Sequence, residues 1–128
     1  MRDYTVSLHR FGITKWQMQA LNALCRQYPE NKRVLSEAPS VRRNRKGKTG
    51  KSPFDPDYVA SVSRKKLSAD VRAVEMAAGM LPKDIQIYVL LNVTQGTPYS
   101  KMNPPVGERQ FRQARRAFYL WLWKFKFQ

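Results

Sequence analysis

The chain has 128 residues, of which 42% are apolar, and it carries 24 Lys and Arg against 9 Asp and Glu, for a net charge of +15. That apolar share suffices for a packed core and excludes wholesale disorder, and the length fits one domain with or without an appended segment. So large a positive charge on so short a chain favours a polyanionic partner, and nucleic acid comes ahead of an anionic membrane surface.

Cys25 is the single cysteine, which excludes a disulfide framework and fits a reducing compartment. Its apolar neighbours predict a buried thiol rather than a nucleophile. The sequence that follows Met1 contains no apolar signal-peptide region, and no segment has the length and apolarity of a membrane span. We therefore expect a cytoplasmic protein with no membrane partner.

The first helix is predicted over residues 14–27, where Thr14 and Gln17 have the spacing of a capping box. Pro29 is expected to end this helix and to open a short second one over 30–37. The two form a predicted N-terminal helical pair, residues 1–39.

A basic segment follows at residues 40–56, and we expect it to be a mobile loop because its like charges repel and it has little apolar surface to bury. Its cations are candidates for contact with nucleic-acid phosphates, and the alternative is a solvated linker between the N-terminal helical pair and the C-terminal bundle. The candidates are Arg42, Arg43, Arg45, Lys46, Lys48 and Lys51.

Asp55 followed by Pro56 predicts the start of a helix that runs to about Met80, with a possible break near Ser68. Its expected buried side comprises Tyr58, Val62, Val71, Val74 and Ala78. The next helix is predicted over residues 83–94, ended by Gly96 in the left-handed conformation. Thr97 is expected to cap a short helix over 98–102. No segment alternates at period two, so no sheet is predicted.

The last quarter of the chain predicts a helix with two distinct faces. Phe111, Ala114, Phe118, Trp121, Leu122 and Phe125 form the apolar side. Four polar residues form the other side, which we call the arginine face: Arg109, Arg112, Gln113 and Arg116. A short helix, a turn containing Pro104 and Pro105, and this helix have the layout of a helix-turn-helix over residues 97–127.

Arginine at the start of such a helix can bond guanine O6 and N7 together, and glutamine can read adenine. The arginine face is therefore a candidate for reading the major groove, and the alternative is a solvated face that keeps an apolar helix soluble. Arg115, which lies toward the apolar side, and Lys101 are candidates for phosphate contacts. Tyr119, Trp123 and Phe127 lie partly off the apolar stripe. They could pack on the N-terminal helices, form a partner or homodimer contact, or stack on bases.

Catalysis and cofactor binding have little support in the sequence. His9 is the only histidine, no cluster has metal-ligand spacing, and the nine acids are scattered. Residues 47–52 look like a phosphate loop, but Arg45 stands where the Walker pattern requires glycine. We expect a protein that is not an enzyme and that has no cofactor and no metal.

The C-terminal third resembles the small phage-encoded transcription regulators of the ArpU/RinA type, which in turn resemble the promoter-reading fourth region of sigma factors. The residues that carry this resemblance form three stretches, 94–99, 106–111 and 115–119. Residues 11–13 and 25–29 are similar to small proteins of prophages and mobile elements in low-GC Gram-positive bacteria. The resemblance implies a DNA-binding regulator of phage or mobile-element origin that acts at the nucleoid of a bacterial host.

The expected fold is all-α: a small helical bundle over residues 57–128 with a C-terminal helix-turn-helix, the mobile basic loop and the N-terminal helical pair. The first functional hypothesis is a transcription regulator that binds double-stranded DNA. The alternative is a phage-encoded interaction protein that binds a host nucleoprotein machine, such as RNA polymerase as an antiterminator or a CRISPR effector as an inhibitor. A nucleic-acid packer without sequence preference is a third.

Overall fold

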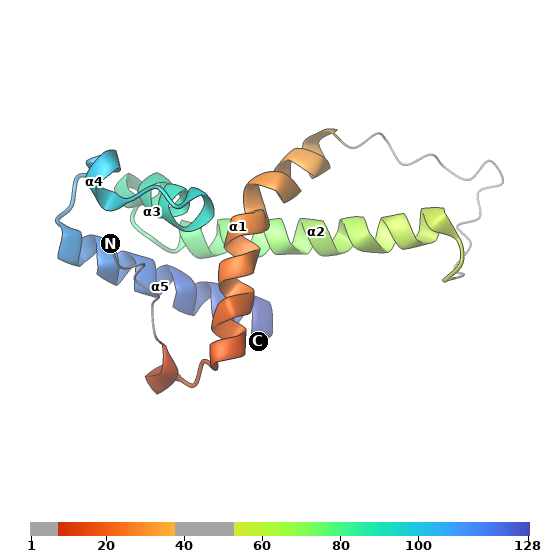
Figure 1. Cartoon of the computed structure of the whole chain (residues 1–128), viewed down its shortest axis with the longest axis horizontal. Helices are drawn as coiled ribbons and strands as arrows, with labels where there is room; N and C mark the ends of the chain where they lie inside the picture. The colour runs from red at the N-terminus through yellow and green to blue at the C-terminus, as the bar shows by residue number, and fades with distance from the viewer. Residues whose placement is uncertain (1–7, 38–52) are drawn as a thin grey trace.

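The computed structural model describes residues 8–37 and 53–128, and within these ranges all the regular secondary structure is helical, without a strand. A 3-10 turn, η1, precedes five α-helices (Figure 1). Their bounds are η1 His9–Phe11, α1 Lys15–Glu37, α2 Pro56–Gly79, α3 Lys83–Gln95, α4 Tyr99–Met102 and α5 Glu108–Phe127. The expectation of an all-α bundle is confirmed for this part of the chain.

The start of α1 is fixed by the predicted capping box. The Gln17 backbone N–H donates to Thr14 Oγ1 at 3.1 Å, and the Thr14 N–H donates to Gln17 Oε1 at 3.1 Å. Two backbone donors that the helix itself cannot satisfy are thereby paired. Ile13, just before the capping box, and Leu21 and Leu24 of α1 are buried in the core.

The prediction that Pro29 separates two helices was wrong, because α1 runs from Lys15 to Glu37 with the proline inside it. Proline inside a helix removes one hydrogen bond and costs about 3 kcal/mol, and Figure 1 shows α1 bending in its second half. Contacts with α2 offset part of this cost: Glu75 accepts from the Tyr28 hydroxyl at 2.8 Å and from Lys32 Nζ at 2.6 Å.

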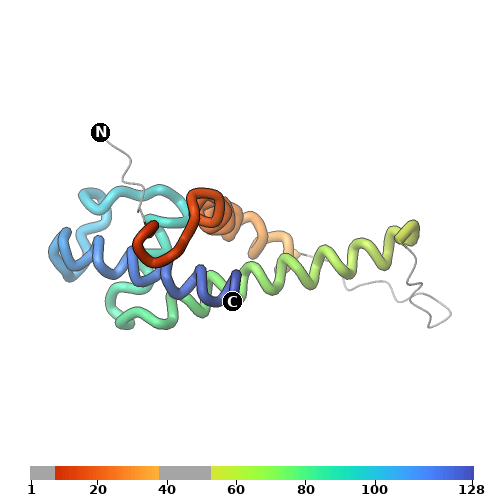
Figure 2. Tube along the Cα trace, turned by 90° about the horizontal axis from the view of Figure 1, so that it is seen from below, coloured from red at the N-terminus to blue at the C-terminus, as the bar shows by residue number. Residues whose placement is uncertain are grey.

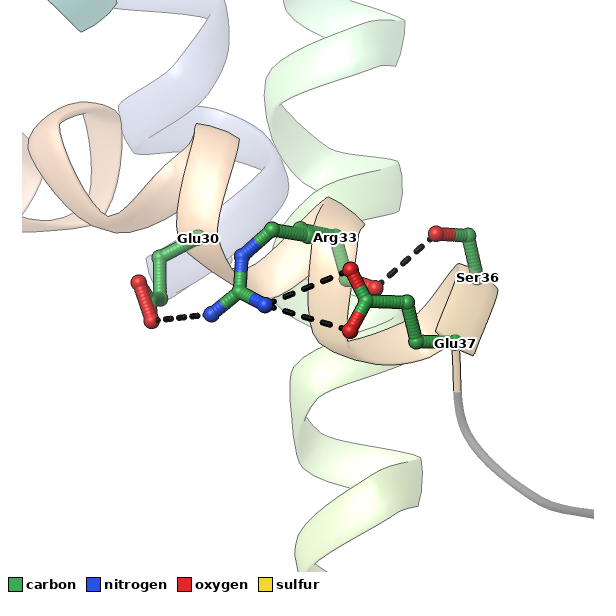
Figure 3. Close-up of polar contacts among 4 residues, drawn as sticks. All are labelled: Glu30, Arg33, Ser36 and Glu37. Carbon is green, nitrogen blue, oxygen red and sulfur yellow. Dashed lines mark hydrogen bonds and ion pairs between the residues drawn. The ribbon is translucent and has the colours of Figure 1, made fainter.

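The last turns of α1 are stabilised by a local ion-pair network (Figure 3). Arg33 lies between two carboxylates, with Glu30 at 2.8 Å and Glu37 at 3.2 Å. These spacings of three and four residues are those that bring side chains together on a helix. The network also neutralises Arg33, so this end of α1 adds little to the positive surface.

Helix α2 begins as predicted, with Pro56 in its first turn and the Asp55 carboxylate accepting from the Asp57 N–H at 3.0 Å. It is continuous through Ser68, so the break considered there is absent. Val71, Val74 and Ala78 are buried, whereas Val62 is 48% exposed and not on the buried side as expected. The reason is visible in Figures 1 and 2: the first half of α2 projects beyond the other helices.

A single core joins all the long helices. Phe118 of α5 is fully buried among residues from α1, α2 and α3, including Cys25, Val74 and Val89. Leu8 and Ile13, on either side of η1, belong to the same cluster. The described N-terminal residues therefore share one core with the C-terminal helices, because α1 packs across α2, α3 and α5.

Candidate nucleic-acid interface

The end of α3 and the start of α4 are set by backbone geometry. Gly96 ends α3 with φ of 72°, and its N–H donates to the Asn92 carbonyl at 3.0 Å, as predicted for a left-handed glycine. The expectation that Thr97 caps α4 was wrong, because Pro98 is at the N-cap position and supplies no side-chain hydrogen bond. Instead the Thr97 carbonyl accepts from Asn92 Nδ2 at 3.0 Å.

The turn between α4 and α5, residues 103–107, is held in a defined shape. Asn103 ends α4 with φ of 53°, the left-handed conformation that asparagine tolerates better than most residues. The Tyr99 hydroxyl donates to the Val106 carbonyl at 2.7 Å, and the Tyr99 ring lies 5.4 Å from that of Phe111. The Tyr99 side chain thus connects α4 to the start of α5, and these contacts fix the direction in which α5 leaves the turn.

The arginine face lies on the outer side of the first half of α5. Arg109, Arg112 and Gln113 are exposed and Arg116 is half-buried. At 100° per residue the four side chains fall within an arc of about 100°, so they point to one side of the helix. The predicted grouping of these residues on one exposed surface is therefore present.

Only one member of the arginine face has a carboxylate partner among the described residues. Arg112 Nη2 lies 3.2 Å from Glu108 Oε2, one turn earlier, and both side chains are more than half exposed. An exposed pair of this kind contributes at most about 1 kcal/mol, so it is readily exchanged for a phosphate or a base. Arg109 and Arg116 form no ion pair within the described ranges.

The second half of α5 is partly covered by α1. Trp123 is half-buried, and its Nε1 donates to Gln17 Oε1 at 3.2 Å, which packs the start of α1 against this part of α5. The arginine face, together with Glu108, spans residues 108–116, a length of about 13 Å at 1.5 Å per residue. This length suits the first turns of a helix that enters a DNA groove.

Arg115 points inward, as its position toward the apolar side predicted. Its Nε is buried and has no hydrogen-bond partner, and its guanidinium carbon lies 6.0 Å from the centre of the Tyr119 ring. An arginine held in this way is less able to reach a phosphate than the arginines of the exposed face. We place it at the edge of the candidate interface.

Tyr119 was grouped with the partner-contact candidates, and the structure contradicts this because its side chain is only 2% exposed. It lies beside Cys25, which is fully buried. Burial raises the pKa of the Cys25 thiol to about 12, against the smaller opposing effects of its hydrogen bond with Tyr119 and of Arg26 and Arg115. Burial also raises the pKa of the Tyr119 phenol. Burial thus favours the neutral form of both groups, and the prediction that the Cys25 thiol is buried is confirmed.

The other two aromatic candidates differ from each other. Trp123 packs on α1 as described above, whereas Phe127, the last residue of α5, is 41% exposed. Lys101 is exposed on α4, next to the turn that leads into the arginine face. The six cations predicted to contact phosphates, Arg42, Arg43, Arg45, Lys46, Lys48 and Lys51, lie outside the described residues.

Two cations near the N-terminus were missed as candidates. Arg10 lies 5.0 Å from the Phe11 ring and Lys15 lies 5.8 Å from the Trp16 ring, and all four residues are exposed. Both views show η1 and the start of α1 beside α5 (Figures 1 and 2). The available signal was a cation directly followed by an aromatic residue, a combination found where proteins bind single strands or bases.

The described part of the chain was also compared with the requirements of a metal site and of a membrane span. No group of three His, Cys, Asp or Glu side chains there could hold a metal ion. None of the described helices combines the length and the hydropathy needed to cross a bilayer. A scan against protein-family models and searches of curated proteins and of solved structures find no match to the chain.

Proposed function

We propose that this protein is a DNA-binding transcription regulator that places the first half of α5 in the major groove. The observation that carries the proposal is the arginine face: three arginines and a glutamine gathered on the exposed side of a helix start that the Tyr99 contacts hold in place. The net charge of +15 adds a general attraction to DNA.

The expected contacts follow from side-chain chemistry. Arg109, Arg112 and Arg116 have spacings of three, four and seven residues, so all three can reach the floor or the walls of one groove. Arginine bonds guanine through two parallel donors, and Gln113 can do the same with adenine. Arg112 must leave Glu108 to make such a contact, and the high exposure of that pair keeps the cost small.

Contacts to phosphates would flank the groove. Lys101 precedes the start of α5 on one side, and Arg10 and Lys15 lie on the N-terminal segment beside the helix. The cations of residues 42–51 would add further neutralisation wherever the duplex passes within their reach. Such contacts set the position of the protein on DNA and carry no sequence preference themselves.

The regulatory setting rests on the resemblance to ArpU/RinA-type phage proteins, with the short α4, the 103–107 turn and α5 in the place of the helix-turn-helix. In this proposal the protein acts in the bacterial cytoplasm, at the nucleoid, without catalysing a reaction. Its partner is duplex DNA, as a monomer or as a homodimer on paired half-sites.

The proposal is tested by fluorescence anisotropy with duplexes enriched by the protein from a random pool. The variant Arg109→Gln/Arg116→Gln removes two charges from the arginine face without breaking an ion pair between described residues. The control Arg64→Gln/Lys66→Gln removes two charges from the projecting half of α2 and has the same net charge. We expect the first variant to lose at least tenfold in affinity for the enriched duplex and the control to lose less than threefold. Equal losses would contradict the proposal, and so would failure to enrich any duplex sequence.

A further inference from the structure

An open groove runs between the middle of α2 and the end of α5. Its floor is apolar, formed by Ala69, Ala73 and Met76 of α2 with Phe125 of α5. Met76 is 46% exposed and Phe125 is half-buried at the edge of the core. The groove has a volume of about 410 Å³ and is open to solvent. It is too open to bury most of a small molecule as ligand pockets do, but it could receive a few apolar side chains from another chain.

Two cations stand along the α2 side of this groove. Lys65 and Arg72 also line it, and seven residues apart they share one face of α2 at a separation of about 10 Å along the helix axis. The nearby carboxylate Asp70 is mostly buried and lies 2.6 Å from Lys126 Nζ, so it is already engaged. Neither Lys65 nor Arg72 forms an ion pair with any carboxylate of the described residues. An apolar floor edged by uncompensated positive charge is complementary to an acidic, amphipathic partner.

The groove is separate from the arginine face. At 100° per residue, Phe125 lies roughly 170° around α5 from the mean direction of Arg109, Arg112 and Arg116. A duplex held by the arginine face would therefore leave the groove open. Phosphates could pair with the two cations but would leave the apolar floor uncovered, so nucleic acid matches only part of this surface.

The small side chains of α2 indicate the shape of the occupant. Ala69 is exposed and Ala73, four residues later, is 7% exposed, so neither side chain projects above this face of α2, and a second helix can approach it closely. Recognition of this kind uses apolar residues at positions i, i+3, i+4 and i+7 of a bound helix, with its polar side at the rim. From this combination we propose that the α2–α5 groove is a docking site for an acidic amphipathic helix of a partner protein.

The test uses a designed, fluorescein-labelled peptide of 18 residues, with Leu at the i, i+3, i+4 and i+7 positions and Glu and Ala elsewhere. One control peptide has the same composition in an order that destroys the apolar face, and a second has Lys in place of Glu. We expect the wild-type protein to bind the ordered acidic peptide at least tenfold more tightly than either control. Equal binding of the ordered and disordered acidic peptides would overturn the proposal, because it would show attraction by net charge alone. Absence of binding to the ordered peptide would overturn it as well.

Two variants locate the binding. Met76→Glu places a negative charge on the groove floor, and Ile87→Glu is its control on α3, where the side chain is 55% exposed and outside the groove. We expect at least a tenfold loss for Met76→Glu and less than a twofold change for Ile87→Glu. If Met76→Glu does not fold, Lys65→Glu/Arg72→Glu takes its place, with the same expected loss. Equal effects of the groove variant and Ile87→Glu would refute the assignment.

A third arm of the experiment distinguishes a protein partner from nucleic acid. The peptide titration is repeated in the presence of saturating duplex DNA, and we expect the peptide affinity to change by less than threefold. Competition between duplex and peptide would overturn the proposal and assign the groove to the nucleic acid. The peptide result does not depend on sequence-specific DNA binding, so either proposal can fail while the other holds.

Discussion

Replacement of Phe118 by alanine tests the arrangement of the helices most severely. The Phe118 side chain is fully buried, and it packs in a cluster to which α1, α2, α3 and α5 all contribute. Truncation removes the ring and leaves a cavity that rigid neighbours cannot fully close, at a cost of about 3–5 kcal/mol. Domains of this size have unfolding free energies of about 5–15 kcal/mol, so the variant should retain only marginal stability.

Urea denaturation followed by circular dichroism measures this effect. At a slope of about 1.5 kcal/mol per molar urea, the loss lowers the midpoint by roughly 2–3 M. Phe118→Leu keeps most of the apolar volume and should lose less than half as much. Phe127→Ala is the matched control, since Phe127 is on the same helix but 41% exposed, and it should change stability by about 0.5 kcal/mol or less. Comparable losses for Phe118→Ala and Phe127→Ala would refute the assignment of the buried face of α5.

Three further predictions concern stability. The unfolding free energy should fall as pH rises from about 9 to about 12. In the unfolded chain the Cys25 thiol ionises near its ordinary pKa of 9.0, whereas in the folded protein the buried thiol stays neutral up to about 12. Denaturation at a series of pH values measures this change. Asp70→Asn should cost about 1–3 kcal/mol in unfolding free energy, because it weakens the mostly buried contact with Lys126. Gly96→Ala should lower the melting temperature, because φ at this position is 72°, a conformation that is strained for any residue with a Cβ.

Each of these predictions has a control within the chain. Cys25→Ala should lose part of the alkaline dependence, and an unchanged pH profile would contradict the cause given for it. Glu108→Gln disrupts an exposed ion pair and should cost less than Asp70→Asn, and the reverse order would contradict the burial of Asp70. Gly79→Ala, at the last residue of α2, adds a Cβ that meets nothing within 4 Å, so this substitution should leave the unfolding free energy unchanged or raise it. A comparable loss at Gly79 would contradict the explanation for Gly96.

Local signals in the sequence predicted three helix boundaries correctly: the starts of α1 and α2 and the end of α3. Thr14 with Gln17, Asp55 with Pro56, and Gly96 each act within four residues, so their effect is set by the neighbouring sequence alone. The buried side of α5 around Phe118 and the exposed arginine face followed from helical periodicity for the same reason.

Three errors arose where the packing of distant segments decides the outcome. Helix α1 continues through Pro29 partly because Glu75, far along the chain, holds Tyr28 and Lys32 on either side of it. Tyr119 lies beside the apolar stripe of α5 and is buried against Cys25 of α1, which no pattern within α5 reveals. Val62 has the spacing of a core residue but lies on the half of α2 that projects past its neighbours (Figure 1).

Substitution of Arg112 by lysine tests the central claim most directly. Lysine keeps the positive charge but loses the planar pair of donors that guanine requires. If α5 reads bases, Arg112→Lys should weaken binding to an enriched duplex by about 1–3 kcal/mol, roughly fivefold to more than a hundredfold, and leave binding to a scrambled duplex nearly unchanged. Equal affinity of the wild-type protein and Arg112→Lys for the enriched duplex would contradict a base-reading role for Arg112, the central residue of the arginine face.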